Sequence, residues 1–162
     1  MVVAGATGPR SVYVNGTFDR VPAERKPGGA PVYRRRAPGG GGGGGGDARW
    51  LFLAPSDNTW YVGGTKSKDA REAAGWAHTA DPVAAGTLPH EAPAGTWEVG
   101  VPGQGFVTQP SVTVRGVTRA EADRLHAAAE AARAAAWDAA AVRGGEAAVA
   151  IVVARATGPR SG

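Results

Sequence analysis

Ten residues near the start of the chain return near its end, and this repetition constrains the fold more than any other feature. Residues 2–11 reappear as residues 152–161 with nine of ten residues identical, a period of 150 residues. The single difference is Gly5, which is replaced by Arg155. Self-similarity at a fixed spacing is typical of repeat proteins, so we interpret the chain as one repeat unit followed by the opening of a second.

The residues before the second copy predict a strand. Residues 147–151 are apolar and end in the β-branched Ile151, a pattern typical of a buried strand. Met1 stands where Ile151 stands, so most of this strand is missing from the first copy. We hypothesise that the chain was cut from a longer tandem array or begins at an internal codon. Residues 146–162 would then be a terminal strand and the start of a second copy, and residues 147–153 would fill the missing place in the first module.

Composition narrows the class of protein. Twenty-six glycines and twelve prolines in 162 residues favour short strands joined by many turns. The absence of cysteine excludes a disulfide framework, a thiolate metal site and a cysteine nucleophile. No apolar run approaches the length of a membrane span, and no secretory signal opens the chain. These features predict an intracellular protein.

Residues 1–116 predict an all-β module. The turn signals at 15–16, 55–58 and 102–105 separate segments rich in aromatic and β-branched residues. Strands at such near-regular spacing favour a compact antiparallel β-meander over βαβ units. The expected strands are residues 12–14, 31–34, 50–53, 59–62, 76–78, 96–99, 105–108 and 111–114.

Four tryptophans fall one per expected strand, at Trp50, Trp60, Trp76 and Trp97. Each can bury a large apolar area, so we expect them to form the core of the sheet. An aromatic platform for a ligand is the alternative.

Eight consecutive glycines, residues 39–46, lie between two expected strands. A Walker phosphate loop would need a following Gly-Lys-Ser or Gly-Lys-Thr, which is missing here. The tract is therefore predicted to be a flexible hairpin loop.

Residues 117–145 predict a long alanine-rich helix. Thr118 and Glu121 have the spacing of a capping box, in which each side chain bonds the other residue's backbone amide. Gly144 and Gly145 are the expected C-cap. We interpret this helix as a spacer between β modules.

The opening motif resembles the start of short-chain dehydrogenases and reductases, where a Gly-rich turn lets a helix approach a cofactor pyrophosphate. Here Gly5, Gly8 and Arg10 would contact the phosphate. Ser11 occupies the third glycine position, and a strand rather than a long helix is expected next. Nucleotide binding at this turn is kept as an alternative that requires a helix beginning near Pro9.

Arg34, Arg35 and Arg36 form the densest basic cluster of a chain with net charge +4. Weak nucleic-acid binding through phosphate contacts is a further alternative. Because acidic residues are interspersed along the chain, a solvated strand end is the favoured interpretation and a nucleic-acid partner is not expected.

No catalytic set emerges from the sequence. The three histidines, at 78, 90 and 126, lack metal-ligand spacing, and the serines lack a nucleophile elbow. His78 shares strand spacing with Trp76 and is the one histidine of interest. We predict neither a cofactor nor a metal.

The β region resembles a small module that recurs in tandem in large, uncharacterised proteins of unicellular algae and related protists. The resemblance rests on an ordered series of motifs rather than on any one of them. It implies the fold and the repetition, but no activity and no catalytic residues. Its departures are the glycine insert and residues 20–26. The motifs here are residues 5–8, 15–18, 31–33, 50–51, 60–62, 75–77, 97–99 and 109–114.

These observations together predict a mainly β module, followed by one long helix and a terminal strand, that acts as a non-enzymatic interaction unit of a larger repeat protein. Its partner would be an unknown protein, a small ligand or a neighbouring repeat module. The expected contact surface is Tyr33, Arg34, Arg35, Trp60 and Trp76.

Overall fold

A computed structural model describes the chain over residues 1–38 and 48–157, with side chains described as far as Gly145. The predicted loop at 39–46 and the last residues of the second copy, 158–162, lie outside the described residues. The chain divides into two compact units, Met1–His126 and Ala127–Gly162. The first unit holds the sheet and the start of the long helix α3.

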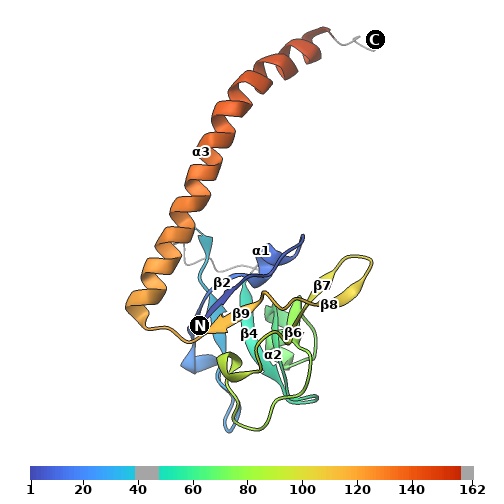
Figure 1. Ribbon diagram of the computed structural model, residues 1–162, viewed down its shortest axis with the longest axis vertical. Coiled ribbons are helices and arrows are strands. Elements are labelled where there is room, and N and C mark those ends of the chain that lie inside the picture. The colour runs from blue at the N-terminus through green and yellow to red at the C-terminus, as the bar shows by residue number, and fades with distance from the viewer. Residues whose placement is uncertain (39–47, 158–162) are drawn as a thin grey trace. The chain divides into compact units, whose positions relative to one another are not determined.

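The described residues form one nine-stranded sheet in which every neighbouring pair is antiparallel (Figure 1). Its spatial order runs β8-β7-β6-β5-β4-β3-β2-β1-β9, so the chain meanders from β1 to β8 and then returns to pair β9 with β1. The sheet is curled into a half-barrel. The predicted antiparallel meander is therefore confirmed. The strands are β1 Val2–Ala4, β2 Gly16–Arg20, β3 Tyr33–Arg35, β4 Arg49–Ala54, β5 Thr59–Gly64, β6 Ala77–Thr79, β7 Trp97–Val101, β8 Gly105–Thr108 and β9 Thr113–Arg115.

The strand predicted at residues 12–14 is wrong. These residues belong to α1, Ser11–Val14, a single helical turn between β1 and β2. The side chain of Asn15 explains the change of direction, because it accepts from the Ala6 N–H and donates to the Ala6 C=O, both at 3.0 Å. This pair of bonds closes the loop that returns the chain from β1 to β2.

The larger hydrophobic cluster lies inside the curl of the sheet. It brings together residues from strands at opposite ends of the spatial order, such as Val3 of β1 and Val99 of β7. Alternate positions of neighbouring strands line up to build it: Leu51 pairs with Val62, and Val62 with Ala77. Fully burying a side chain of this kind contributes about 2 kcal/mol. The cluster consists of Val3, Ala6, Val14, Phe18, Tyr33, Leu51, Trp60, Val62, Ala77, Val83, Trp97, Val99 and Val112.

The opposite face of β4 carries a smaller cluster, in which Trp50 and Phe52 are buried. A short helix missed by the sequence analysis, α2 (Thr65–Ala70), contacts this strand. Its Lys68 is almost fully buried, with Nζ 4.0 Å from the centre of the Trp50 ring and 2.6 Å from carboxylate oxygens of Glu24 and Asp69. The two carboxylates and the ring provide the electrostatic compensation that a buried ammonium needs.

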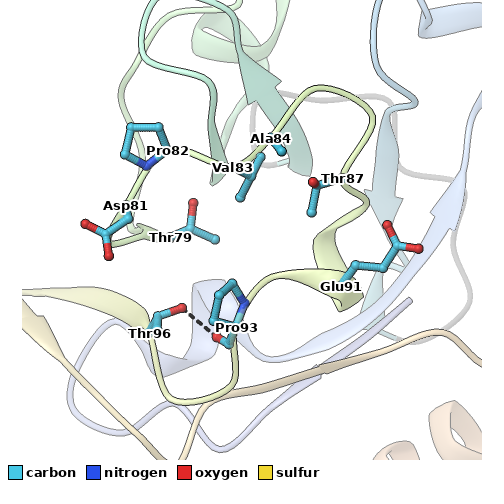
Figure 2. Close-up of a pocket in the computed structure, with 9 residues that line it drawn as sticks. All are labelled: Thr79, Asp81, Pro82, Val83, Ala84, Thr87, Glu91, Pro93 and Thr96. Carbon is cyan, nitrogen blue, oxygen red and sulfur yellow. Dashed lines mark hydrogen bonds between the residues drawn. The ribbon is translucent and has the colours of Figure 1, made fainter.

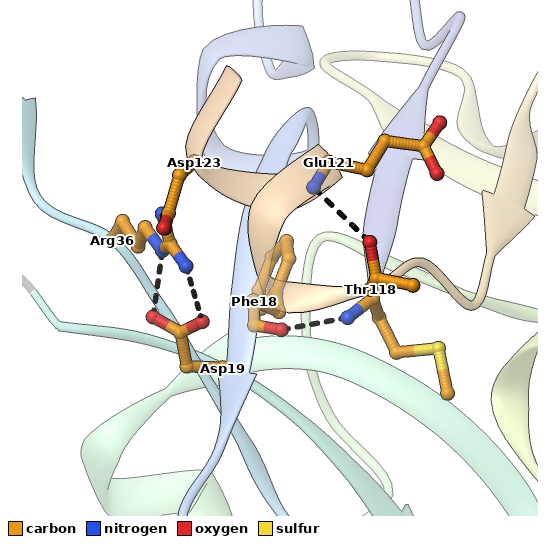
Figure 3. Close-up of polar contacts among 7 residues, drawn as sticks. Phe18, Asp19, Arg36, Thr118, Glu121 and Asp123 are labelled. Atoms are coloured by element: carbon orange, nitrogen blue, oxygen red, sulfur yellow. Dashed lines mark hydrogen bonds and ion pairs between the residues drawn. The ribbon is translucent and has the colours of Figure 1, made fainter. Parts of the chain in front are cut away.

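The long helix α3 runs from Arg119 to Thr157. Its predicted start is confirmed, since Thr118 Oγ1 accepts from the Glu121 N–H at 3.2 Å (Figure 3). The reciprocal half of the capping box is replaced by a 3.5 Å contact between the Glu121 carboxylate and Arg115.

The predicted end of the helix and the terminal strand are both wrong. The helix passes through Gly144 and Gly145 and includes residues 147–153. Each glycine costs a helix only about 1 kcal/mol relative to alanine, and extending an existing helix needs no new nucleus. The place expected for the strand is also taken, because β1 already pairs with β2 on one side and β9 on the other.

Candidate functional site

The expected contact surface is divided between the core and the exterior. Tyr33 and Trp60 are 6% and 0% exposed, and their ring centroids lie 6.3 Å apart inside the curl. Trp60 Nε1 also donates to the Thr87 carbonyl at 2.9 Å. Burial takes both rings out of the expected surface, while Trp76 remains half-buried. The predicted core role of the tryptophans is confirmed for Trp50, Trp60 and Trp97.

The arginine cluster makes contacts within the protein. The Arg34 guanidinium lies 5.4 Å from the centre of the Trp50 ring, and Arg35 Nε donates to the Asn15 carbonyl at 2.8 Å. Arg36 donates to both carboxylate oxygens of Asp19, at 2.8 and 2.9 Å, and to Asp123 at 2.7 Å (Figure 3). The hydrogen bonds that Arg36 donates to these carboxylates, those to Asp19 above all, raise the pKa of Arg36 above its ordinary value. The cluster thus links β2, the end of β3 and the N-terminal part of α3.

The glycine motif does not meet the requirement for a nucleotide site of the Rossmann type. The helix that follows β1 has four residues, and both neighbours of β1 are antiparallel to it. That fold places a long helix after a strand of a parallel sheet. A Cβ atom added at Gly5 would lie 2.0 Å from the Ser111 carbonyl oxygen, so protein rather than ligand occupies the space beside it. Arg10 lies against Gly100 of β7.

Trp76 belongs to a cluster of two aromatic rings and an arginine that the sequence analysis did not identify. The Tyr13 and Trp76 ring centroids are 5.1 Å apart, and the Arg49 guanidinium lies 4.6 and 4.7 Å from them. All three side chains are half-buried. Tyr13 arrives from α1 and Arg49 from β4, so only the tertiary structure brings them to Trp76.

A row of rings crosses the outer face of the sheet. Phe52 and Tyr61 are directly paired, as are Tyr61 and His78, and the Phe106 ring centroid lies 4.4 Å from that of His78. His78 Nδ1 lies 2.8 Å from the Thr79 carbonyl, and its Nε2 lies 3.4 Å from the Glu98 carboxylate. His78, singled out from the sequence, therefore sits between two rings with both nitrogens facing oxygen atoms.

Tyr61 is the titratable group most perturbed in this row. Burial is the largest cause that raises its pKa, followed by its 2.9 Å hydrogen bond to Asp57, and together with nearby carboxylates they bring the value to about 12. A phenol with that pKa stays protonated near neutral pH. Tyr61 is therefore not available as a general base near neutral pH.

A pocket of about 250 Å³ opens between the loop after β6 and the segment around the short helix Pro89–Glu91 (Figure 2). Its rim carries the carboxylates of Asp81 and Glu91, and Val83 forms part of its apolar wall. Glu91 is already used, because its carboxylate accepts from the Leu88 N–H at 2.8 Å. Thr96 Oγ1 likewise donates to the Pro93 carbonyl at 2.6 Å. The volume is below the usual range for pockets that bind drug-sized ligands.

Strand β8 is the most exposed strand of the sheet. All four of its residues are exposed, with Phe106 at 45% and Val107 at 37%. It lies at one end of the strand order and pairs only with β7 among the described strands. The Gly100 N–H donates to the Trp76 carbonyl, so the peptide groups of Gly100 face β6 and not β8. Gly100 is opposite Phe106 in the β7–β8 ladder, and this pair is therefore a non-hydrogen-bonded one. The N–H and C=O of Phe106, and of Thr108 two residues on, therefore point outward from the sheet edge.

Comparisons with known proteins add no assignment: no family model, no curated protein and no solved structure matches the chain. Over residues 1–38 and 48–157, no helix is both long and apolar enough to cross a membrane. Within the same residues, no three histidine or carboxylate side chains gather in a way that would hold a metal ion. Among the described residues, the exposed edge of β8 is the strongest candidate for a binding site.

Proposed function

We propose that residues 1–126 are a non-enzymatic interaction module of a larger repeat protein, and that the partner is another copy of the same module joined through β8. The observation that carries this proposal is the edge of β8, where outward-pointing peptide groups coincide with exposed Phe106 and Val107. An exposed apolar edge strand is a template for pairing with another strand.

A second copy of β8 fits this edge because the strand is self-complementary. In an antiparallel pair centred on Val107, Phe106 of one copy lies opposite Thr108 of the other. These two residues carry the outward N–H and C=O groups, so the pair forms four backbone hydrogen bonds. Val107 meets its own counterpart on one face, and Phe106 packs over Thr108 on the other. Such a two-fold interface uses the same patch on both copies.

Charge supports the same pairing. Residues 99–114 contain no charged side chain, so two copies of β8 meet without repulsion. The opposite edge strand, β9, ends in Arg115, whose guanidinium contacts Glu121 at the start of α3. Charged residues are a common means by which proteins block edge-to-edge pairing. The chain has this protection at β9 and lacks it at β8.

A binding role rather than a catalytic one is supported by how the reactive groups of the outer face are used. His78 is packed between Tyr61 and Phe106, and Tyr61 is hydrogen-bonded to Asp57. These groups hold one another in place instead of converging on an open space. Arg34, Arg35 and Arg36, on which the alternative of weak nucleic-acid binding rested, have internal partners, and we do not carry that alternative forward.

The test is the oligomeric state of the full chain by sedimentation equilibrium, with variants that change only the outer edge of β8. Thr108→Pro removes an outward N–H that β7 does not use, and Thr108→Val is the matched control that keeps it. We expect wild type and Thr108→Val to form dimers. We expect Thr108→Pro to weaken association at least tenfold, about 1.4 kcal/mol.

Phe106→Lys gives an independent variant, since it adds a charge to the edge without altering the backbone. It should also yield monomers. A wild-type chain that remains monomeric at all concentrations, or dimers that survive both Thr108→Pro and Phe106→Lys, would overturn the proposal. Circular dichroism melts of each variant confirm that the sheet itself is intact.

A further inference from the structure

Strand β1 occupies a slot between two other strands. Val2 pairs with Thr17 of β2 on one side and with Arg115 of β9 on the other. The Met1 amine donates to the Phe18 carbonyl, and the Phe18 N–H donates to the Met1 carbonyl, both at 2.8 Å. We call the site that holds residues 1–7 the β1 slot: it consists of the facing edges of β2 and β9 and of the side chains that bind residues 5–7.

The polar contacts of the slot are made to the backbone of its occupant. Asn15 bonds the N–H and C=O of Ala6, and Gln109 bonds the N–H and C=O of Thr7 at 2.9 and 3.2 Å. Ser111 Oγ donates to the Gly5 carbonyl at 2.8 Å. Any segment that follows the same backbone path can make all of these bonds, whatever its side chains.

The apolar contacts of the slot place requirements on only two positions of its occupant. Val3 is 1% exposed and Ala6 is 6% exposed, so these two positions need a β-branched and a small residue. The second copy of the decapeptide has Val153 and Ala156 at the corresponding places. It also has Ile151 in place of Met1, which keeps an apolar side chain and a backbone N–H there.

The single mismatch between the copies falls where the slot cannot accept it. Gly5 has φ +86°, a conformation that other residues rarely adopt, and Arg155 stands at its place in the second copy. A Cβ atom at Gly5 would also lie 2.0 Å from the oxygen and 2.8 Å from the carbon of the Ser111 carbonyl. Both atoms belong to the backbone, which cannot move aside as a flexible side chain would.

From these contacts we infer that the β1 slot is a strand-binding site with the backbone and apolar contacts to accept the C-terminal copy of the decapeptide, from the same chain or a second one, and that in the natural sequence Arg155 alone keeps this copy out. With glycine at position 155, residues 151–157 have the backbone groups and apolar side chains that the slot contacts in residues 1–7. Arg155 is then a specificity-determining residue, and it keeps β1 from being exchanged for its own duplicate.

Residues 127–150 separate the first unit from the second copy and lie within α3. If this part of α3 unwinds, its 24 residues can extend to about 80 Å. The second copy has to leave α3 before it can enter the slot, since residues 152–157 are helical. Substitutions at position 155 therefore affect both the helix and the fit to the slot, and the experiment has to separate the two effects.

Engineered disulfides in the full chain provide the test, because the sequence has no cysteine of its own. Val2→Cys with Arg115→Cys marks the native pair of β1 and β9, and its yield calibrates the geometry. Val152→Cys with Arg115→Cys reports entry of the second copy. The second pair is compared in four backgrounds: wild type, Arg155→Gly, Arg155→Ala and Ala154→Gly.

We expect a disulfide yield several-fold above wild type in Arg155→Gly alone, within one chain or between two chains. Arg155→Ala removes the charge but keeps the Cβ atom, so it should resemble wild type. Ala154→Gly weakens the helix to the same extent without relieving the clash, so it should also resemble wild type. The inference is overturned if Arg155→Gly gives no increase while the native pair cross-links, or if either control cross-links equally well.

Discussion

Residues 2–11 and residues 152–161 differ at one position in ten, yet their described parts have different secondary structures. Residues 2–4 form a strand paired on both sides, whereas residues 152–157 continue a helix. The sequence Val-Val-Ala therefore has no fixed conformation of its own. In the first copy, two neighbouring strands and a buried site for Val3 determine the state. In the second, the preceding alanine-rich helix extends through the segment at small cost per residue.

The largest predicted effect comes from making the first copy resemble the second. Gly5→Arg forces a side chain into a left-handed conformation and into the Ser111 carbonyl. We expect a loss of about 3 kcal/mol, enough to lower Tm by roughly 10 °C. Gly8→Arg is the matched control, because Gly8 has φ +88° but no atom within 4 Å of the added Cβ. Thermal melts should show a much smaller decrease for Gly8→Arg; equal decreases would show that the contact with Ser111 is unimportant.

A smaller loss of stability is expected when side-chain hydrogen bonds to the backbone of the first copy are removed. Asn15→Ala removes both bonds to Ala6 and leaves those backbone groups half-buried without a partner. Urea unfolding should show a loss of about 2 kcal/mol. Gln109→Ala removes the equivalent pair of bonds to Thr7, but at an exposed site. It should cost about half as much, and a larger loss at Gln109 would reverse the assigned order of importance.

The smallest predicted effect is a pH dependence of stability. It comes from the position just before each copy of the decapeptide, where Met1 has a terminal amine and Ile151 has a peptide N–H. Burial lowers the pKa of the Met1 amine from its ordinary value of 8.0, with Asp19 opposing this shift and Arg36 adding to it. The folded chain therefore binds this proton less tightly than the unfolded chain. The stabilisation is complete above pH 8 and is lost as pH falls toward the lowered value.

Urea midpoints between pH 9 and pH 7 should show this decline for the free amine. An N-terminally acetylated chain, which has a peptide N–H like that of Ile151, should show a flatter profile. Identical profiles would indicate that the amine does not contribute to the pH dependence of folding.

Much of the sheet was predictable because its strands carry strong local signals. The segments around Trp50, Trp60 and Trp97 combine aromatic and β-branched residues between recognisable turns, and they form β4, β5 and β7 as expected. The helix at 12–14 was not predictable in this way, since Val12 and Val14 have the composition of a strand. Its turn is stabilised by Asn15, which bonds a backbone nine residues away in sequence.

The candidate site was less predictable than the fold. Trp60 has the residue type of a contact surface but is fully buried, because the curl of the sheet encloses that face. Phe106 was recognised only as part of a strand. The uncharged stretch 99–114 was visible in the sequence, but its significance depends on β8 being an edge strand, which the order of pairing decides.

The sequence by itself determined most of the extended segments between residues 31 and 114, where the long helix begins and that two near-identical decapeptides are present, because each depends on residues close together in the chain. Only the tertiary structure decided the order of the strands, which edge is exposed and which copy becomes a strand. These outcomes depend on contacts between distant residues, such as Gly5 with Ser111, and local propensity contains no information about them. The exchange of one glycine for arginine is a small change in sequence, and its consequence comes from the backbone packed against it.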